Sequence, residues 1–274
     1  MRPAAPGPIA SARARRGAVA GFPRLLVVAA LLIAAAWTVA VTQWQPRGLW
    51  AGLLLHSVPF GLALPALVAA ALSTRGPWRR PAELTLPGHA RLRVPPGPGF
   101  GWFVAGQVLA ITNATVTVAD FEWLDAPDAP PAPLRYALVV PPAVMVAVAA
   151  LIIAVFVAAV FGGWPRIDIT PSAVEVREPF GRRTIPWAAL RPGTPARQPT
   201  GDHLVLTVAR PESVDRRGLL RGSATAPRLV LSWLRVHPWL LADVIRYYVD
   251  RPDERAAIGT PEGYDRLRRA VGLA

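Results

Sequence analysis

The sequence contains no cysteine and no lysine among its 274 residues. Without cysteine the chain has no disulfide framework, no thiolate nucleophile and no zinc–thiolate site. All 30 basic residues are arginine, so the formal net charge of +13 comes from arginine alone. Alanine, proline and glycine are also abundant, and we attribute the arginine bias to a GC-rich bacterial genome. No nucleic acid is therefore expected as a partner.

Charged residues of either sign are scarce, at 17% of the chain, against about 25% in soluble domains. Three long stretches, residues 25–46, 48–74 and 136–165, carry no charge at all. A helix needs about 20 apolar residues to cross a bilayer. Each stretch is long enough, so the sequence predicts three membrane spans and excludes a soluble globular protein.

A fourth uncharged stretch, residues 94–119, allows two interpretations. It opens with three prolines and contains Gln107 and Asn113. It is either a polar transmembrane helix over about residues 100–118 or a half-buried β-strand, because ITNATVTV alternates polar and apolar residues. The positive-inside rule favours the helix, since four spans leave both arginine-rich segments and the C-terminal region in the cytoplasm and the acidic loop outside.

The sequence therefore predicts an α-helical transmembrane bundle of four helices, with three as the alternative. A disordered basic tail covers residues 1–23, and a transmembrane region covers residues 24–163. The spans are expected at about residues 25–42, 49–72, 100–118 and 136–163.

Small residues recur every fourth position in two spans. They are Ala30, Ala34, Thr38 and Thr42 in the first span and Ala150, Ala154, Ala158 and Gly162 in the last. Such a face lets another helix approach closely, within the chain or from a second copy. The alternative is that an alanine-rich helix carries this pattern by chance.

Beyond residue 164 the pattern changes to short alternating runs, which predict several antiparallel strands. The clearest are RIDI, AVEVRE, HLVLTVAR and RLVLSWLRV, with a further strand from Arg182 to Trp187. His237-Pro238 then opens an amphipathic helix. Its apolar stripe is Leu240, Leu241, Val244, Ile245 and Tyr248. We expect this stripe to pack in one core with Val174, Val176, Ile185, Trp187, Leu204 and Leu206, and we expect Trp233 and Trp239 to be packing residues too.

The segment RIDITPSAVEVREPFGRRTIPWAAL, with Ile185-Pro186-Trp187 near its end, resembles the bacterial pleckstrin-homology-like (PH-like) domains of actinobacterial multi-pass membrane proteins. The resemblance covers roughly residues 164–262. It implies an α+β domain over residues 164–250, a small antiparallel β-barrel capped by one helix, with a helical tail over residues 251–274. It implies no catalytic residue.

Candidate binding residues follow from the same resemblance. In eukaryotic relatives of this fold, basic residues near strand loops hold phosphoinositide headgroups, which points to Arg182 and Arg183 beside the Phe180-Gly181 turn. Arg216, Arg217 and Arg221 are predicted to form a second basic loop. Guanidinium groups suit phosphate well. The alternative is that all five are ordinary solvated charges.

Motifs for catalysis and metal binding are missing from the sequence. There is no phosphate-binding glycine-rich loop, no nucleophile elbow and no His-Glu-x-x-His helix. Four acidic residues, Asp120, Glu122, Asp125 and Asp128, lie in a proline-rich stretch without the spacing of a calcium loop. We expect a solvated acidic loop there, no metal and no cofactor.

The predicted function is that of a non-enzymatic integral protein of a bacterial plasma membrane with both termini in the cytoplasm. It would present its PH-like module to membrane lipids of the inner leaflet, to a protein partner, or to a second copy through the small-residue helix faces. The alternative is a component of a transport complex in which the polar third span, with Gln107 and Asn113, lines a pathway.

Overall fold

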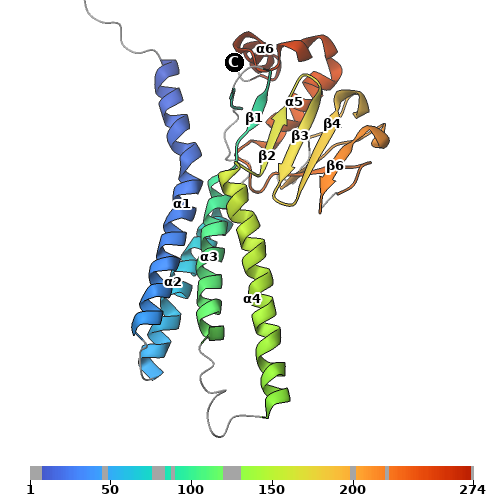
Figure 1. Cartoon of the computed structure of the whole chain (residues 1–274). Helices are drawn as coiled ribbons and strands as arrows, with labels where there is room; N and C mark the ends of the chain where they lie inside the picture. Colours follow the sequence, from blue (N-terminus) through green and yellow to red (C-terminus); the bar gives the residue numbers. More distant parts are fainter. Residues whose placement is uncertain are drawn as a thin grey trace, which may run out of the picture. The chain divides into compact units, whose positions relative to one another are not determined.

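A computed structural model describes residues 8–44, 49–75, 84–87, 90–119, 131–197, 202–219 and 222–272 (Figure 1). The chain divides into two compact units that alternate along the sequence. The helical unit comprises residues 1–72 and 99–160, and the sheet unit comprises residues 73–98 and 161–274.

Four helices make up the helical unit. They are α1 (Pro8–Trp44), α2 (Leu49–Thr74), α3 (Pro98–Ala119) and α4 (Ala132–Phe161). The bounds of α2, α3 and α4 lie within four residues of the predicted spans 49–72, 100–118 and 136–163, whereas α1 begins 17 residues before the first predicted span, 25–42. The predicted disordered tail over residues 1–23 differs, because α1 already begins at Pro8. The alanines and arginines of this segment are strong helix formers, which favours a helix there.

Among the described residues, three segments are long and apolar enough to cross a membrane. They are Phe22–Gln43 in α1, Ser57–Thr74 in α2 and Val140–Phe161 in α4. The strand alternative for residues 94–119 is wrong, because α3 is a helix of 22 residues. The hydroxyls of Thr112 and Thr115 donate to the carbonyls of Val108 and Ile111, both at 2.8 Å. These bonds give threonine a satisfied place inside a helix despite its preference for strands.

The interior of the helical unit is built from small and branched apolar residues. Its buried cluster is Ala30, Ala63, Ala105, Val108, Leu109 and Ile153. Glycine allows close approach at two points of α3. A Cβ on Gly101 would lie 2.7 Å from Cα of Pro23, and one on Gly106 would lie 2.8 Å from Cδ2 of Leu67. α3 is therefore packed against both α1 and α2.

The sheet unit contains two antiparallel sheets. The larger has the order β1-β2-β3-β4-β6, side by side in Figure 1. Its strands are β1 (Leu92–Val94), β2 (Arg166–Ile169), β3 (Ala173–Glu178), β4 (Gly181–Pro186) and β6 (Asp215–Gly218). The smaller sheet pairs β5 (His203–Val205) with β7 (Arg228–Val230). This antiparallel region is consistent with a PH-like domain, while the predicted small β-barrel is not confirmed.

The sheet unit begins earlier in the chain than the sequence analysis placed it. β1 lies between α2 and α3, in the stretch assigned to the transmembrane region, and it pairs with β2 in the register Leu92↔Ile169 and Val94↔Ile167. A strand of three residues followed by Pro95 and Pro96 is too short to reveal itself by alternation. Its place in the sheet therefore depends on pairing with a strand more than 70 residues away.

The helix α5 (Pro238–Asp250) covers the core, and its predicted apolar stripe is buried throughout. The predicted core residues of β3, β4 and the β5 region are buried as well, so this prediction is confirmed. Among the described residues, three short 3₁₀ segments, η3 (Trp187–Ala189), η4 (Pro211–Ser213) and η5 (Pro252–Ala257), connect the elements.

The C-terminal segment, predicted as a separate helical tail, belongs to the same core. It contains α6 (Pro261–Ala270), and Ile258 and Leu267 are each only 1% exposed. Gly259 has a φ of +87°, and a Cβ there would lie 2.3 Å from the backbone nitrogen of Arg91. Only glycine allows the turn before α6 to approach the segment that precedes β1 so closely.

Candidate functional site: the polar face of the five-stranded sheet

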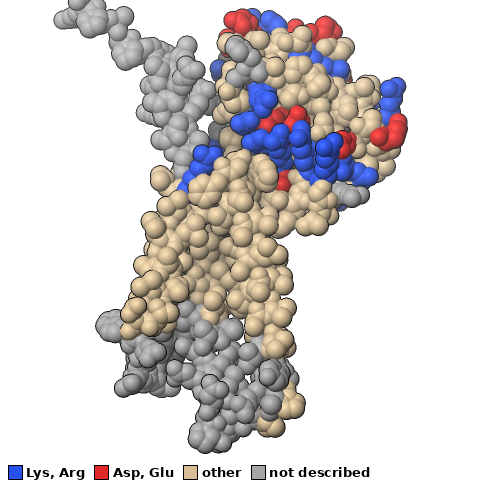
Figure 2. All heavy atoms as spheres, viewed as in Figure 1, with Lys and Arg blue, Asp and Glu red and all other residues tan. Residues whose placement is uncertain are grey.

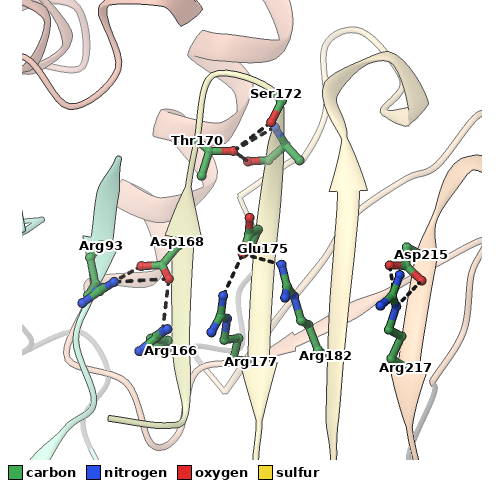
Figure 3. A network of polar contacts seen from close by, with 11 residues as sticks. Arg93, Arg166, Asp168, Thr170, Ser172, Glu175, Arg177, Arg182, Asp215 and Arg217 are labelled. Atoms are coloured by element: carbon green, nitrogen blue, oxygen red, sulfur yellow. Dashed lines mark hydrogen bonds and ion pairs between the residues drawn. The ribbon is translucent and has the colours of Figure 1, made fainter. Parts of the chain in front are cut away.

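One face of the five-stranded sheet packs on the core, and the other carries charged side chains. Successive side chains of a strand point to opposite faces. In β2, Ile167 and Ile169 are therefore directed into the core, while Arg166 and Asp168 share the other face. Figure 3 shows this polar face with arginines and carboxylates drawn from four strands and from β1.

Four arginines lie directly opposite one another across four neighbouring strands. The register pairs Arg166 with Arg177, Arg177 with Arg182, and Arg182 with Arg217. We call these four residues the arginine row. Neighbouring strands are about 4.8 Å apart, so the row extends for about 14 Å. Like charges directly opposite one another disfavour strand pairing.

A second row, two residues further along each strand, supplies the compensating charge. It consists of Asp168, Glu175, Thr184 and Asp215, with Arg93 opposite Asp168. Figure 3 shows its three carboxylates on one side of the arginine row. We call these three carboxylates the carboxylate row.

Each carboxylate is shared between arginines or paired with one. Nε of Arg93 donates to Oδ1 of Asp168 at 2.6 Å, and Nε of Arg166 lies 3.1 Å from Oδ2 of the same residue. On β3, Oε2 of Glu175 accepts from Nη2 of Arg177 at 3.4 Å and from Nη2 of Arg182 at 3.1 Å. On β6, Nε of Arg217 donates to Oδ2 of Asp215 at 3.0 Å.

The carboxylates do not balance the arginines on this face. Among the residues of the two rows and Arg93, five guanidinium groups stand against three carboxylates, which leaves a surplus of two positive charges. Nε of Arg166 and Nε of Arg177 are buried and make no hydrogen bond within the described part of the chain. At Arg166 the nitrogen is within ion-pair distance of Asp168 but its N–H is not directed at the carboxylate, so we count the charge as paired and the donor as unused.

The electrostatics of Arg166 reflect the crowding of positive charge. Burial, followed by the charges of Arg93 and Arg177, lowers the pKa of Arg166 below its ordinary value, while Asp168 opposes the shift. An arginine remains protonated at neutral pH despite such a shift. A further anion at this position would relieve the repulsion.

Exposure increases across the arginine row. The side chain of Arg166 is 15% exposed, that of Arg177 27%, that of Arg182 47% and that of Arg217 79%. Arginine side chains appear as a continuous blue band with enclosed red carboxylates on this part of the sheet unit in Figure 2. The β4 and β6 end of the row is thus the part most open to a ligand.

The predicted binding arginines separate onto two faces. Arg182 and Arg217 belong to the polar face, but Arg183 and Arg216 point to the opposite side, because they alternate with them along β4 and β6. Arg183 is 7% exposed, and its Nη2 donates to Oε1 of Glu178 at 2.8 Å. Arg216 donates from Nη1 to the carbonyl of Gly222 at 2.9 Å.

The second basic loop was predicted wrongly in its first half, because Arg216 and Arg217 lie in strand β6. All four residues of β6 are exposed, so the sequence lacks the apolar alternation that identifies a strand. The predicted binding residue Arg221 lies outside the described residues, as do Asp120, Glu122, Asp125 and Asp128 of the predicted acidic loop.

Sequence reasoning missed Arg93, Arg166 and Arg177 as site residues. The alternation in RIDI and AVEVRE does place Arg166 and Arg177 on the polar faces of their strands. What it cannot supply is the register, which aligns residues 166, 177, 182 and 217. Hairpin geometry gives the pairing of β3 with β4, but β6 joins from more than 30 residues away.

A cleft of about 490 Å³ beside α5 and α6 is a second candidate site. It is lined by Arg197, Asp243, Arg246, Tyr247, Asp250, Arg251, Ala270 and Val271. Arg197 holds both oxygens of Asp243, at 2.6 Å for Nη2 and Oδ2, and Arg246 also pairs with Asp243. Arg251 lies over the ring of Tyr247 at 4.6 Å. Its three arginines stand against two carboxylates, Asp243 and Asp250, so the cleft has a smaller surplus of positive charge than the polar face.

Two of the tryptophans predicted as packing residues differ in their surroundings. Trp187 is 3% exposed and donates from Nε1 to the carbonyl of Thr170 at 2.8 Å, as the prediction requires. Trp239 is 41% exposed, so its prediction as a packing residue is wrong. As the second residue of α5 it points away from the stripe, and Arg197 lies 5.3 Å from its ring centre.

Comparison with known proteins supports the assignment of the sheet. The model of the bacterial PH domain family matches residues 164–192, which cover β2, β3, β4 and η3. No curated protein matches the chain. No solved structure matches it either. The chain thus combines three helices able to span a membrane with a sheet region that matches the bacterial PH domain family.

Proposed function

We propose that this chain is a non-enzymatic integral protein of a bacterial plasma membrane that presents a PH-like module on the cytosolic face, to the inner leaflet or to a protein partner. We also propose that it belongs with the actinobacterial multi-pass proteins that its sequence resembles. The proposal combines the membrane spans with the match to the bacterial PH domain family. Its topology depends mainly on one observation, the pairing of β1 with β2.

The pairing of β1 with β2 supports four spans. β1 precedes α3, β2 follows α4, and the two strands pair residue by residue. Paired strands lie on the same side of a membrane, so the chain between them crosses it an even number of times. Since α4 is long and apolar enough to cross, α3 is the helix that would cross in the other direction.

The same argument supports a common side for both termini. α1 and α2 both precede β1 and both carry a candidate span, so two crossings return the chain to the side on which it began. The arginine-rich segment at residues 75–93 has five arginines against Glu83 alone. Under the positive-inside rule that side is the cytoplasm.

Reporter fusions at Pro87, Asp128 and Ala274 test this topology. Alkaline phosphatase, which is active only outside the cytoplasm, is expected to be active at Asp128 and inactive at the other two positions. Activity at Ala274 would contradict both the four-span count and any role at the inner leaflet.

The alternative, a transport component, is favoured by the surroundings of α3. Its Val104, Ala105 and Val108 are buried inside the helical unit, and Gln107 is half-buried between them. A polar side chain in such a position can line a pathway between helices. The measurement is ion flux into proteoliposomes that contain the protein. Flux that is lost in Gln107→Leu would favour a transport component, and absence of flux in the wild type would favour the interaction module.

A second copy of the chain is a further candidate partner in the proposal. The alanines Ala150, Ala154 and Ala158 of α4 are exposed, whereas Ile153 and Val157 of the same helix pack within the helical unit. Cross-linking in membranes would reveal such a homo-oligomer as a species of twice the mass.

A further inference from the structure

The connections to the helices define one end of the five-stranded sheet. Arg166, the first residue of β2, comes five residues after Phe161, the last residue of α4. At the same end, α3 begins four residues after Val94, the last residue of β1. Five residues of chain reach at most about 17 Å. Chain length alone therefore keeps this end of the sheet close to the ends of two helices.

The arginine row lies at this end, and the carboxylate row lies further away. Arg166 begins β2, and its register partners form the rest of the row, while Asp168, Glu175 and Asp215 are two positions further from the helix connections. The sheet thus has a direction of charge, with the arginines nearer to the connections. Figure 3 shows the same separation of the two rows.

An exposed apolar side chain lies beyond the row at the same end. Leu219 is 86% exposed and directly follows Gly218, which pairs with Gly181 one position past the Arg182–Arg217 pair. An apolar side chain beside several arginines is typical of surfaces that rest on a bilayer, because the apolar group enters the interface and the cations meet lipid phosphates.

We propose that the arginine row and Leu219 form a lipid-binding face that contacts phosphate groups of anionic lipids in the leaflet adjoining the ends of α3 and α4. This inference rests on the proposed function, since it requires the chain to span the membrane. The exposed guanidinium groups of Arg182 and Arg217 supply donors for the phosphates, and the surplus positive charge of the face attracts them. Four arginines in register oppose strand pairing, and such local conflicts occur mainly at functional sites.

The direction of charge favours a lipid over an acidic protein. An acidic protein in solution could bind the exposed β4 and β6 edge from any direction. The arginine row and Leu219 instead lie at the end of the sheet that is connected to α3 and α4. A tethered face also needs little intrinsic affinity, because linkage to the spans gives it a high effective concentration at the bilayer.

The absence of cysteine permits a direct test with one introduced label. Full-length protein with Leu219→Cys, carrying a polarity-sensitive fluorophore, is placed in nanodiscs of phosphatidylcholine alone or with phosphatidylglycerol. The emission is expected to shift to the blue with phosphatidylglycerol, and added salt should reverse the shift because it screens the charges. Equal emission in both discs would overturn the proposal.

Two variants and a control assign the effect to the row. Arg182→Gln with Arg217→Gln, the two most exposed members, should lose most of the shift, while Glu175→Gln should increase it by removing the carboxylate that Arg177 and Arg182 share. Arg191→Gln with Arg228→Gln, two exposed arginines outside the row, should change nothing. A shift that survives the first pair, or that Glu175→Gln lowers, would refute the role of the row.

Further measurements distinguish an anionic lipid from other ligands. They also distinguish failure of this inference from failure of the proposed function. Inorganic phosphate added to phosphatidylcholine discs should leave the emission unchanged, and a phosphate response without a phosphatidylglycerol response would contradict a lipid ligand. A response to polyglutamate alone would identify an acidic protein and refute the lipid. If the fusions place the C-terminus outside, the proposed function fails whatever the nanodiscs report. If topology holds and phosphatidylglycerol has no effect, only this inference fails.

Discussion

Trp187 connects several parts of the sheet unit through one side chain. Its indole N–H donates to the carbonyl of Thr170, its ring lies 6.0 Å from that of Tyr248 on α5, and the guanidinium of Arg255 lies over it at 5.4 Å. The residue therefore links the strands, the covering helix and the C-terminal segment. Burial among these groups also raises the pKa of the Tyr248 hydroxyl.

Trp187→Ala should destabilise the sheet unit by about 3–5 kcal/mol, because it removes a buried ring and leaves a cavity. Trp239→Ala is the matched control. That ring is 41% exposed, so its loss should cost about 1 kcal/mol or less, mainly the contact with Arg197. Amide hydrogen exchange of β2 to β4 in the detergent-solubilised protein measures both. Similar losses of stability in the two variants would contradict the burial of Trp187 in the core.

The residue at the entrance of α5 makes stability depend on pH. Burial, followed by the charge of Arg197, lowers the pKa of His237 below its ordinary value of 6.5, and Asp243 opposes the shift. The unfolded chain therefore binds a proton more readily than the folded one. This contribution is fully present above pH 6.5 and is lost as the pH falls below that value.

His237→Gln should reduce the loss of thermal stability on acidification from pH 7.5 to pH 5.5, about one pH unit on either side of the ordinary histidine pKa. The measurement is the difference in unfolding midpoint between the two pH values for wild type and variant, both in the same detergent. An unchanged difference would mean that His237 is not a source of the acid sensitivity.

At the scale of the elements, a fragment of residues 164–274 expressed alone would lack strand β1. Three buried side chains, Leu84, Leu92 and Val94, come from residues 73–98. Burial of each contributes roughly 1.5–3 kcal/mol, against a total stability of about 5–15 kcal/mol for a domain. The fragment is therefore expected to unfold without a cooperative transition or with a much lower midpoint.

Residues 73–98 joined through a glycine–serine linker to residues 161–274 should restore a cooperative transition. The linker replaces the helices between Pro98 and Phe161, and the paired register of β1 with β2 brings its two ends close together. Circular dichroism at increasing urea concentration compares the two proteins. A fragment as stable as the joined protein would show that β1 is dispensable.

Elements with long apolar runs could be predicted from the sequence, and short or polar ones could not. The helices of the membrane region and α5 follow from composition and period, because each buries many residues in one pattern. β1 has three residues and β6 has no buried residue, so neither carries such a pattern. α3 could be assigned as a helix only by weighing charge distribution against the strand-like alternation of ITNATVTV.

The candidate site could be predicted only in part, for a related reason. The sequence indicates Arg182 and Arg217, but it groups them with Arg183 and Arg216, which alternation directs to the other face. Arg166 and Arg177 become site residues only through strand register, which is a long-range property. The resemblance to PH-like domains pointed to loops, whereas the arginines that converge lie within strands.

At the scale of the whole molecule, the two units are interleaved along the chain. α3 and α4 form an insertion between β1 and β2, which are neighbours in the sheet. The chain passes between the two units three times, after α2, before α3 and after α4.

The most direct test of the account is the accessibility of Asp128→Cys in intact cells. Fusions at Pro87 and Asp128 shorten the chain and remove the pairing of β1 with β2, whereas a single cysteine leaves the full protein in place. A membrane-impermeant maleimide should label Asp128→Cys without permeabilisation, while Ala270→Cys, exposed on α6, should react only after permeabilisation. Protection of Asp128→Cys in intact cells together with labelling of Ala270→Cys would contradict the four-span topology and the cytosolic position of the sheet.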